Sequence, residues 1–258
     1  MIELEKSRTQ LEALKLFTAA NLLESRLQIA TEKNMTYVSF ISDLLAEELE
    51  QRHRRNIETK SCLAHLPYRK TLDEFDFSFQ PSVDQKLIAE LRTLNFINQA
   101  ANRIFLRPPG VGKSHLAVAL TIEANSHGYS ADFITATKLI EDLRKAYQNN
   151  RLDTRMRKYL NPKLLVIDEV GYLPLDQLRA SLFFQLINAR YEQGSIILTS
   201  NKTFANWSEL FGDEVLATAI LDRLLHHSHI VNIRGQSYRL KDKLKAGVLS
   251  APNNRQSS

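Results

Sequence analysis

The sequence of 258 residues lacks several features that mark particular classes of protein. It has one cysteine, Cys62, so no disulfide can form within the chain, and we expect a reducing, cytoplasmic location. It has no run of about 18 apolar residues, the length that a membrane helix needs, so we expect no membrane partner. Its first residues, Met-Ile-Glu-Leu-Glu-Lys, lack the basic start and apolar centre of a signal peptide.

Glycine is absent from residues 1–109, and this favours continuous helices over hairpins in the first part of the chain. Thr36 is placed to cap a long helix. The apolar residues that would share one face of that helix are Val38, Ile41, Leu44, Leu45 and Leu49. We therefore expect a small all-helical N-terminal domain at residues 1–66, which contacts a partner protein or DNA.

The remaining residues divide into a linker, a larger domain and a tail. Residues 67–82 carry alternating phenylalanines and indicate an extended linker whose aromatic side chains pack onto the next domain. Between residues 83 and 244, helical stretches (the first near 83–98) alternate with apolar runs. Strands are expected near 103–107, 131–135, 164–168, 195–199 and 229–233. This alternation predicts an α/β fold with a parallel sheet covered by helices on both faces. Residues 245–258 are polar and aperiodic, and we expect them to be disordered.

The net charge of +5 is unevenly distributed. Residues 1–75 hold 11 Lys and Arg against 12 Asp and Glu, whereas residues 76–258 hold 23 against 17. The excess of positive charge in the larger domain suggests a polyanionic partner.

A near match to a phosphate-binding loop follows the apolar run Ile104-Phe105-Leu106. Residues 108–114 read Pro-Pro-Gly-Val-Gly-Lys-Ser, close to the end of the pattern G-x-x-x-x-G-K-[ST]. The glycines let backbone N–H groups turn toward an anion, Lys113 can reach the terminal phosphates, and the Ser114 hydroxyl can bind magnesium. The residues expected to contact nucleotide are Pro108, Pro109, Gly110, Val111, Gly112, Lys113, Ser114 and His115. The alternative is a glycine turn without a ligand.

Arg107 stands at the first position of this pattern, where glycine is expected. If the backbone there needs a positive φ, a side chain costs about 1–2 kcal/mol. We expect nucleotide binding to be weakened rather than abolished. The variant Arg107→Gly should tighten ATP affinity, and an unchanged affinity would show that the position tolerates arginine.

A second motif ends in two acids, 55 residues after Lys113. Residues 164–167 are unbroken apolar, which fits a strand buried on both faces of a parallel sheet. Asp168 then falls at the carboxyl end of the strand, where such sheets bind ligands, and is expected to hold magnesium. Glu169 can orient and deprotonate an attacking water. The two motifs together predict binding and hydrolysis of ATP with Mg²⁺, whereas the acids alone could simply be solvated at the end of a strand.

Residues 144–163 form a basic segment with seven Lys and Arg and one acid, Asp153. Such a density of cations can follow the phosphates of double-stranded DNA without reading bases, although a solvated helix face is the alternative. The residues expected to contact DNA are Arg144, Lys145, Arg151, Arg155, Arg157 and Lys158. The cluster from Arg52 to Arg55 is a second candidate, for DNA or a partner protein.

Three histidines, His226, His227 and His229, lie close together in the sequence. No cysteine and no H-E-x-x-H spacing accompanies them, so the pattern gives little support to a zinc site. We expect side chains that face a subunit interface or DNA.

The motifs resemble those of a known family, the IstB-like transposition helper ATPases, over nearly the whole chain. The similar blocks are residues 110–120, 164–174, 197–202, 212–228 and 237–241, together with Asp73-Glu-Phe-Asp-Phe in the linker. Block 212–228, with the stretch Leu-Asp-Arg-Leu-Leu-His-His, is highly specific. The resemblance implies an AAA+ P-loop NTPase fold related to the DnaC helicase loaders. Arg107 departs from the family, which has glycine there.

The resemblance also implies roles that spacing alone does not give. Asn201 would be the sensor that positions the attacking water, and Arg223 would be an arginine finger that reaches the site of a neighbouring subunit in a homo-oligomer. Arg239 would be a second sensor that contacts phosphates within its own subunit. For Asn201 and Arg223 the alternatives are a turn residue at a strand end and a solvated helix residue.

The function implied by the resemblance is an ATP-dependent helper that assembles on target DNA and recruits or stimulates a transposase. Hydrolysis would then reset the complex. A replicative helicase loader is the nearest alternative, and the N-terminal helices would decide between the two partners. A small-molecule kinase needs no water-activating glutamate, so Glu169 argues against one. A DNA-binding adaptor that does not hydrolyse ATP would follow if Arg107 disables the loop.

Overall fold

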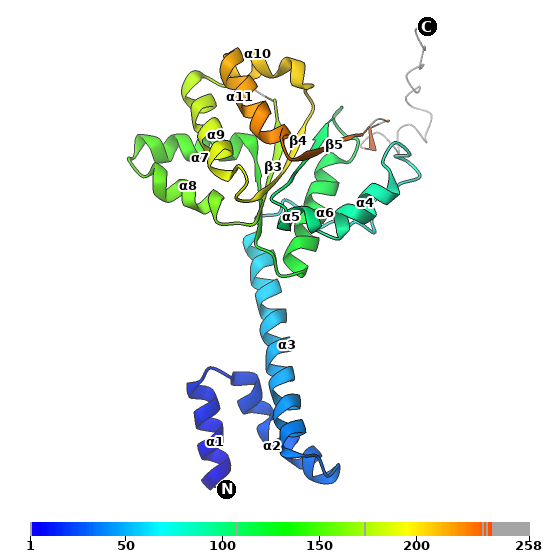
Figure 1. Cartoon of the computed structure of the whole chain (residues 1–258), viewed down its shortest axis with the longest axis vertical. Helices are drawn as coiled ribbons and strands as arrows, with labels where there is room; N and C mark the ends of the chain where they lie inside the picture. Colours follow the sequence, from blue (N-terminus) through cyan, green and yellow to red (C-terminus); the bar gives the residue numbers. More distant parts are fainter. Residues whose placement is uncertain (1, 107, 173, 234, 236, 239–258) are drawn as a thin grey trace. The chain divides into compact units, whose positions relative to one another are not determined.

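The computed structural model (Figure 1) describes residues 2–106, 108–172, 174–233, 235, 237 and 238, without the side chains at 53, 57, 58 and 60–63. The chain divides into two compact units, Met1–Thr59 and Lys60–Ser258. The tail expected at residues 245–258 lies outside the described residues. Helices α1 (Ile2–Ala13), α2 (Phe17–Glu32) and α3 (Tyr37–Leu63) begin the chain, and α3 extends past the boundary between the units.

The N-terminal unit has a small apolar core and an exposed apolar stripe. The Ser39 N–H donates to Thr36 Oγ1 at 3.2 Å, so the predicted cap of α3 is confirmed. Ala19, Leu23 and Leu44 form the buried core. The rest of the predicted apolar face is exposed within this unit: Val38, Ile41, Leu45 and Leu49. Although α3 is 27 residues long, no helix in the described part of the chain could cross a membrane.

A buried carboxylate closes the start of α2 in the same unit. Glu48 on α3 is 2% exposed and accepts the Thr18 and Ala19 N–H groups at 2.7 and 3.0 Å. It also accepts Arg52 Nε at 2.9 Å. Leu16, the N-cap residue of α2, offers no side-chain acceptor, so Glu48 does the work of an N-cap from another helix. The sequence pattern gave no indication of this cross-helix cap.

The second unit is built on a five-stranded parallel sheet in the order β2-β3-β4-β1-β5. The strands are β1 (Asn102–Leu106), β2 (Ala131–Thr135), β3 (Leu164–Val170), β4 (Ser195–Ser200) and β5 (Ser228–Asn232). Leu106 pairs with Ser200, and Ser200 pairs with Val170, so the carboxyl ends of β1, β4 and β3 meet at one edge. The phosphate-loop and acid motifs are thereby brought to the same edge.

Helices cover both faces of the sheet, and this confirms the predicted α/β fold (Figure 1). Strand side chains alternate between two cores: Ile104 and Leu106 enter one, and Phe105 enters the other. One face carries α4 (Gln85–Arg92), α5 (Asn95–Asn98) and α6 (Lys113–Ser126). The other carries α7 (Ala136–Gln148), α8 (Leu152–Leu160), α9 (Gln177–Arg190), η1 (Phe204–Asn206), α10 (Trp207–Phe211) and α11 (Glu214–Leu225).

Two local expectations differ from the structure. The helix expected near 83–98 is broken into α4 and α5, because Leu94 between them has a φ of 59°. Residues 67–82 do not run extended: turns close where Phe75 N–H donates to Leu72 O, and Gln80 N–H donates to Asp76 O. Phe75 is buried in the core beside β1 and α6, with the Phe77 ring 4.9 Å away. This segment therefore packs against the second unit and forms part of its surface.

Arg190, at the end of α9, is a buried cation that holds the C-terminus of α8. It is 1% exposed, and its guanidinium donates to Tyr159 O at 2.7 Å, Pro162 O at 3.0 Å and Ser195 O at 2.9 Å. Burial lowers the pKa of Arg190 to about 10, so it stays protonated at neutral pH. A Cβ at Gly194 would lie 2.6 Å from an Arg190 Nη, which explains glycine beside it.

Candidate nucleotide-binding site

The loop between β1 and α6 needs both of its glycines. Gly110 has a φ of 84° and Gly112 a φ of 101°, a region that side chains rarely adopt. A Cβ at Gly112 would lie 2.7 Å from the Phe75 ring, and one at Gly110 would lie 2.1 Å from Ser237 Oγ. Gly112 is also the N-cap residue of α6, so the first N–H groups of that helix face the loop. Arg107 lies outside the described residues.

Lys113 and Ser114, the first residues of α6, are tied to the loop and to β3. Lys113 is 8% exposed, and its Nζ donates to Pro108 O at 2.8 Å across the loop. The Ser114 hydroxyl donates to Asp168 Oδ1 at 2.9 Å. Val111 anchors the same loop in the apolar core. Fixed in this way, the ammonium and the hydroxyl are presented together to a ligand on the loop.

The end of β3 contains a β-bulge at the two acids. Ile167 pairs with Leu198 and Val170 with Ser200, so Asp168 and Glu169 together stand opposite Thr199 alone. Glu169 has a φ of 63°, a left-handed conformation that costs a residue with a side chain about 1–2 kcal/mol. The bulge breaks the alternation of the strand, so the two carboxylates do not simply point to opposite faces.

Asn201, directly after β4, completes the group. A cavity of about 30 Å³, room for one water, is lined by Lys113, Ser114, Glu169, Thr199 and Asn201, together with Pro109, Gly110 and Tyr172. Asn201 Oδ1 is buried and accepts no hydrogen bond from the described residues. A buried polar atom without a partner is costly, which suggests that a ligand or water completes it. Residues from both motifs, together with Asn201 from the family resemblance, therefore surround one small space, and Asp168 is joined to it through Ser114.

A second hollow of about 150 Å³ shares Gly110, Lys113 and Ser114 with the first. It is lined by residues 110–115 and by Tyr68, Lys70, Glu74, Phe75, Asp76, Gln80 and Tyr238. His115 contributes its ring, which donates from Nε2 to Thr71 O at 2.8 Å. Burial lowers the pKa of His115 despite that bond, so the ring is neutral at pH 7. The sequence did not assign residues 68–80 to the site, although their alternating aromatics indicated that they pack against this unit.

The donors at the edge of the sheet fit magnesium. Mg²⁺ prefers oxygen ligands and keeps several waters. The Ser114 hydroxyl and the Asp168 carboxylate are oxygen donors in direct contact, and Asn201 Oδ1 lies beside the same cavity. When bound, the ion supplies positive charge to phosphate oxygens.

Arg223 is not part of this group in the described structure. Arg223, on α11, donates from Nε to Asn188 Oδ1 at 2.7 Å and from Nη1 to Ala219 O at 3.0 Å. Its guanidinium lies 5.1 Å from the centre of the Phe184 ring, so α9 holds it at the surface of its own unit. The lining of the cavity beside Lys113 does not include it. Arg239 lies outside the described residues.

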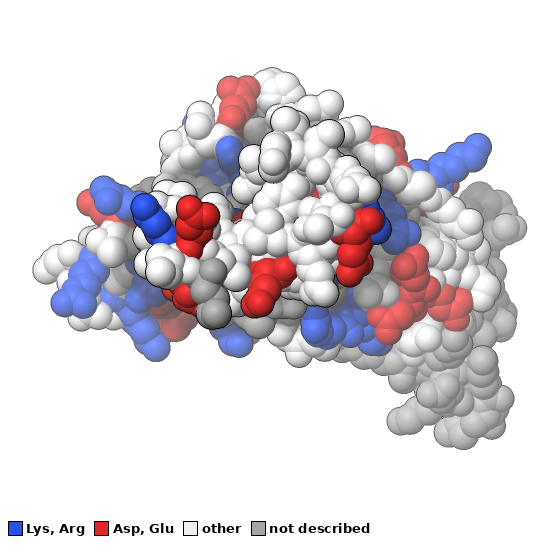
Figure 2. All heavy atoms as spheres, turned by 90° about the horizontal axis from the view of Figure 1, so that it is seen from below, with Lys and Arg blue, Asp and Glu red and all other residues white. Residues whose placement is uncertain are grey.

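The basic segment spans α7, α8 and the turn between them, and half of its candidate cations are paired. Glu141 takes both a two-point bond from Arg144 at 2.8 and 3.0 Å and an ion pair with Lys145 at 3.8 Å. The Arg144 bond lowers the pKa of Glu141 to about 2, and Arg155 pairs with Asp142 at 3.6 Å. Within the described structure, no ion pair is formed by Arg151, Arg157 or Lys158. On the face drawn in Figure 2, basic and acidic side chains are interspersed.

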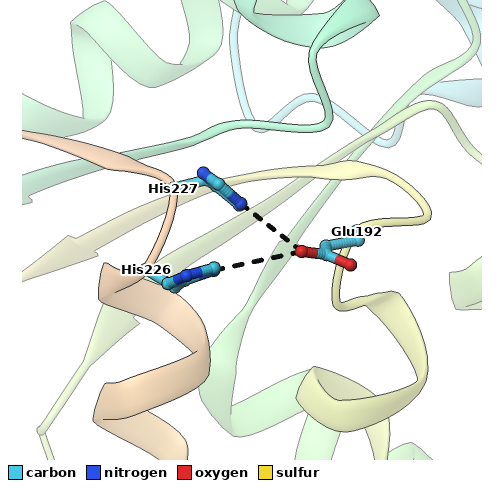
Figure 3. Close-up of side chains that lie close together, drawn as sticks. All are labelled: Glu192, His226 and His227. Atoms are coloured by element: carbon cyan, nitrogen blue, oxygen red, sulfur yellow. Dashed lines mark ion pairs between the residues drawn. The ribbon is translucent and has the colours of Figure 1, made fainter.

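The histidines form a small exposed cluster (Figure 3). His227 Nε2 lies 3.4 Å from Glu192 Oε1 and His226 Nδ1 lies 4.0 Å from it, while the Tyr191 hydroxyl is 2.7 Å from His226 Nδ1. The cluster joins the turn after α9 to the end of α11. His226 already has a hydrogen-bond partner in Tyr191. These contacts are therefore more typical of packing between the ends of α9 and α11 than of a metal site. His229, on β5, is exposed within this chain.

Comparison with known proteins agrees with these motifs. Residues 9–246 match the family described as IstB-like ATP binding protein. An insertion sequence IS21 protein from Pseudomonas aeruginosa, described as ATP-binding, is 50% identical over 240 residues, 93% of this chain and 91% of the relative. Two solved structures share the fold at 22% identity. AMPPCP-bound DnaA from Aquifex aeolicus has a TM-score of 0.54, over 73% of this chain and 59% of DnaA. The DnaC helicase loader has a TM-score of 0.50, over 66% of this chain and 97% of the loader. This chain therefore belongs to the IstB-like ATP-binding proteins, on an AAA+ P-loop fold.

Proposed function

We propose that this protein is an ATP-dependent, DNA-binding helper of transposition that hydrolyses ATP with Mg²⁺. The observation that carries the proposal is the meeting of Lys113, Ser114, Glu169 and Asn201 around one water-sized cavity, with Asp168 bonded to Ser114. The family membership adds the setting, because its relative belongs to an insertion sequence.

In the proposed reaction, each residue acts through the atoms described above. Lys113 would turn its ammonium from Pro108 O to the terminal phosphates, and Ser114 and Asp168 would hold Mg²⁺. Glu169 accepts a proton from the attacking water, a role that contributes about 10²–10⁴-fold to such reactions. Asn201 orients the same water. The hollow beside the loop, lined by the rings of Tyr68, Phe75 and Tyr238, would offer aromatic contacts to the base of the nucleotide.

Assembly would use surfaces away from the cavity. Arg223 would leave Asn188 and neutralise charge on a nucleotide bound by a second copy of the chain, and Arg239 would contact phosphates within its own subunit. The basic segment of α7 and α8 would follow duplex phosphates. The N-terminal domain, residues 1–66, would engage the transposase. Residues 67–82 would join it to the ATPase domain, residues 83–244, while packing against that domain. Hydrolysis in the cytoplasm would dismantle the complex.

ATP turnover with and without duplex DNA tests the hydrolytic part of the proposal. We expect phosphate release that depends on Mg²⁺ and rises with DNA. The variant Lys113→Ala should lower it about 10²-fold or more, because a group that stabilises phosphate charge is lost. Calorimetry with Mg·ATP provides the binding reference. Heat of binding without turnover, with or without DNA, would instead indicate an adaptor that binds ATP and DNA only.

A second experiment identifies the protein partner. Affinity capture with the full chain should retain the transposase encoded with the same insertion sequence, and more of it with ATP than with ADP. Retention of a replicative helicase in place of a transposase would overturn the proposed partner and favour a helicase loader.

A further inference from the structure

Two buried hydroxyls of β4 face the bulge at the end of β3. Thr199 and Ser200 are 1% and 0% exposed. Thr199 Oγ1 lies 2.9 Å from the Glu169 backbone nitrogen and 2.5 Å from Asp168 Oδ1. The Ser200 hydroxyl donates to Val170 O at 2.6 Å. Bonds from side-chain hydroxyls thus replace the regular backbone hydrogen bonds between β3 and β4 where the extra residue of β3 interrupts them.

The direction of each bond at Thr199 follows from the chemistry of its partners. A backbone N–H can only donate, so Thr199 Oγ1 accepts from Glu169. The single hydroxyl proton of Thr199 is then left for Asp168 Oδ1, which accepts as a carboxylate. The same oxygen accepts from Ser114 at 2.9 Å. One hydroxyl therefore joins the acid expected to hold magnesium to the backbone of the acid expected to activate water.

The bulge makes this connection necessary. Glu169 is held at a φ of 63°, and a strained conformation persists only where its surroundings fix it. Asp168 and Glu169 oppose Thr199 alone in the register, so no ladder position is left for the second of them. The bond from Glu169 N–H to Thr199 is what ties the backbone of that residue to β4.

We propose that Thr199 is a positioning residue whose hydroxyl sets Asp168 and Glu169 in their relative places for hydrolysis. The inference rests on the proposed ATPase function. The Thr199 hydroxyl would affect metal binding and the activation of the attacking water, but it would not affect how the loop binds phosphates. Removing the hydroxyl should consequently affect kcat and the Mg²⁺ requirement far more than KM for ATP.

The test compares Thr199→Val, which keeps the shape and loses the hydroxyl, with Thr199→Ser, which keeps the hydroxyl. Thr121→Val is the matched control, because Thr121 is also fully buried and bonds only Ala117 O within α6. We expect Thr199→Val to lower kcat about 10–100-fold and to raise the half-saturating Mg²⁺ concentration several-fold, the range seen when an outer partner of a metal ligand is lost. KM for ATP should stay within about threefold, and serine should restore most of the loss.

Hydrogen exchange gives a readout that does not depend on turnover. In the full-length protein without ligand, the Glu169 amide should exchange faster in Thr199→Val than in Thr121→Val. If the wild type releases no phosphate, the proposed function fails, and Thr199 is judged by this exchange and by the Mg²⁺ dependence of ATP binding. Equal exchange, or equal kcat and Mg²⁺ dependence in the two valine variants, would overturn the inference.

Discussion

Charged side chains in the nucleotide-binding site are held by partners within the fold, whereas most of those in the basic segment stand on the surface. Lys113 donates to Pro108 O at 2.8 Å, and Ser114 donates to Asp168 at 2.9 Å. Arg151 and Arg157 are exposed and form no ion pair with the described residues. Side chains in the nucleotide-binding site are therefore fixed in one conformation, whereas the exposed arginines of the basic segment can adopt several rotamers.

This difference predicts how each region responds to substitution. Loss of a held group leaves its partners unsatisfied and misplaces its neighbours, so effects should be large and non-additive. Loss of an exposed cation removes one phosphate contact, so effects should be modest and additive.

The largest expected effect is that of Glu169→Gln. Glutamine keeps the shape but cannot take a proton, so kcat should fall about 10²–10⁴-fold while Mg·ATP still binds. Steady-state phosphate release and calorimetry measure the two quantities. Glu192→Gln is the matched control, because Glu192 also has a positive φ, 57°, but lies with the histidines on the turn after α9. Equal turnover in both variants would show that Glu169 does not activate the attacking water.

Arg190→Met tests a fully buried cation next to the basic segment. Methionine leaves carbonyls of the α8–β3 turn and Ser195 without a donor, so unfolding free energy should fall by about 3 kcal/mol. Urea denaturation measures the change. Arg157→Met, on the exposed side of α8, should change stability by less than about 0.5 kcal/mol. If both substitutions cost the same, burial does not distinguish these two arginines.

The DNA surface should divide according to ion pairing. Replacing Arg151, Arg157 and Lys158 together by glutamine should weaken duplex binding about tenfold or more, and reduce the slope of log affinity against log salt by about three. Arg144→Gln should do less, because Glu141 already occupies that guanidinium. Fluorescence anisotropy across a salt series checks both. A flat salt response in the wild type would argue against phosphate contacts altogether.

The smallest expected effect concerns Glu48 in the N-terminal unit, where a buried, hydrogen-bonded carboxylate can be compared with an exposed one. Burial alone would raise the pKa of Glu48, but bonds from Ala19 N–H, Arg52 and Thr18 lower it below its usual value. The cap on α2 therefore stabilises this unit above pH of about 4.5, and its contribution is lost as the pH falls through the lowered pKa.

Glu48→Gln should speed amide exchange at Thr18 and Ala19 at pH 7, equivalent to about 1 kcal/mol, and reduce its dependence on acid. Glu50→Gln is the control, since Glu50 forms only an exposed pair with Arg54. Identical exchange in the two variants would show that Glu48 does not act as a cap.

The sequence predicted the sheet and the loop between β1 and α6 because both follow from local patterns. Unbroken apolar runs at residues 104–106 and 164–167 indicated strands covered on both faces, and glycines next to Lys113 indicated the loop. The break at Leu94 was missed, because no glycine or proline marks it. The bulge at Glu169 and the partnership with Thr199 depend on strand register, which no local pattern encodes. Arg190 was missed because an arginine at a helix end normally indicates solvent.

The backbone at Glu169 has a consequence for protein engineering. Its left-handed conformation suits glycine, asparagine and aspartate better than glutamate, so a change to glycine would relieve about 1 kcal/mol of strain while removing the acid. A search for more stable variants of this chain that scores stability alone should therefore favour loss of the carboxylate at this position.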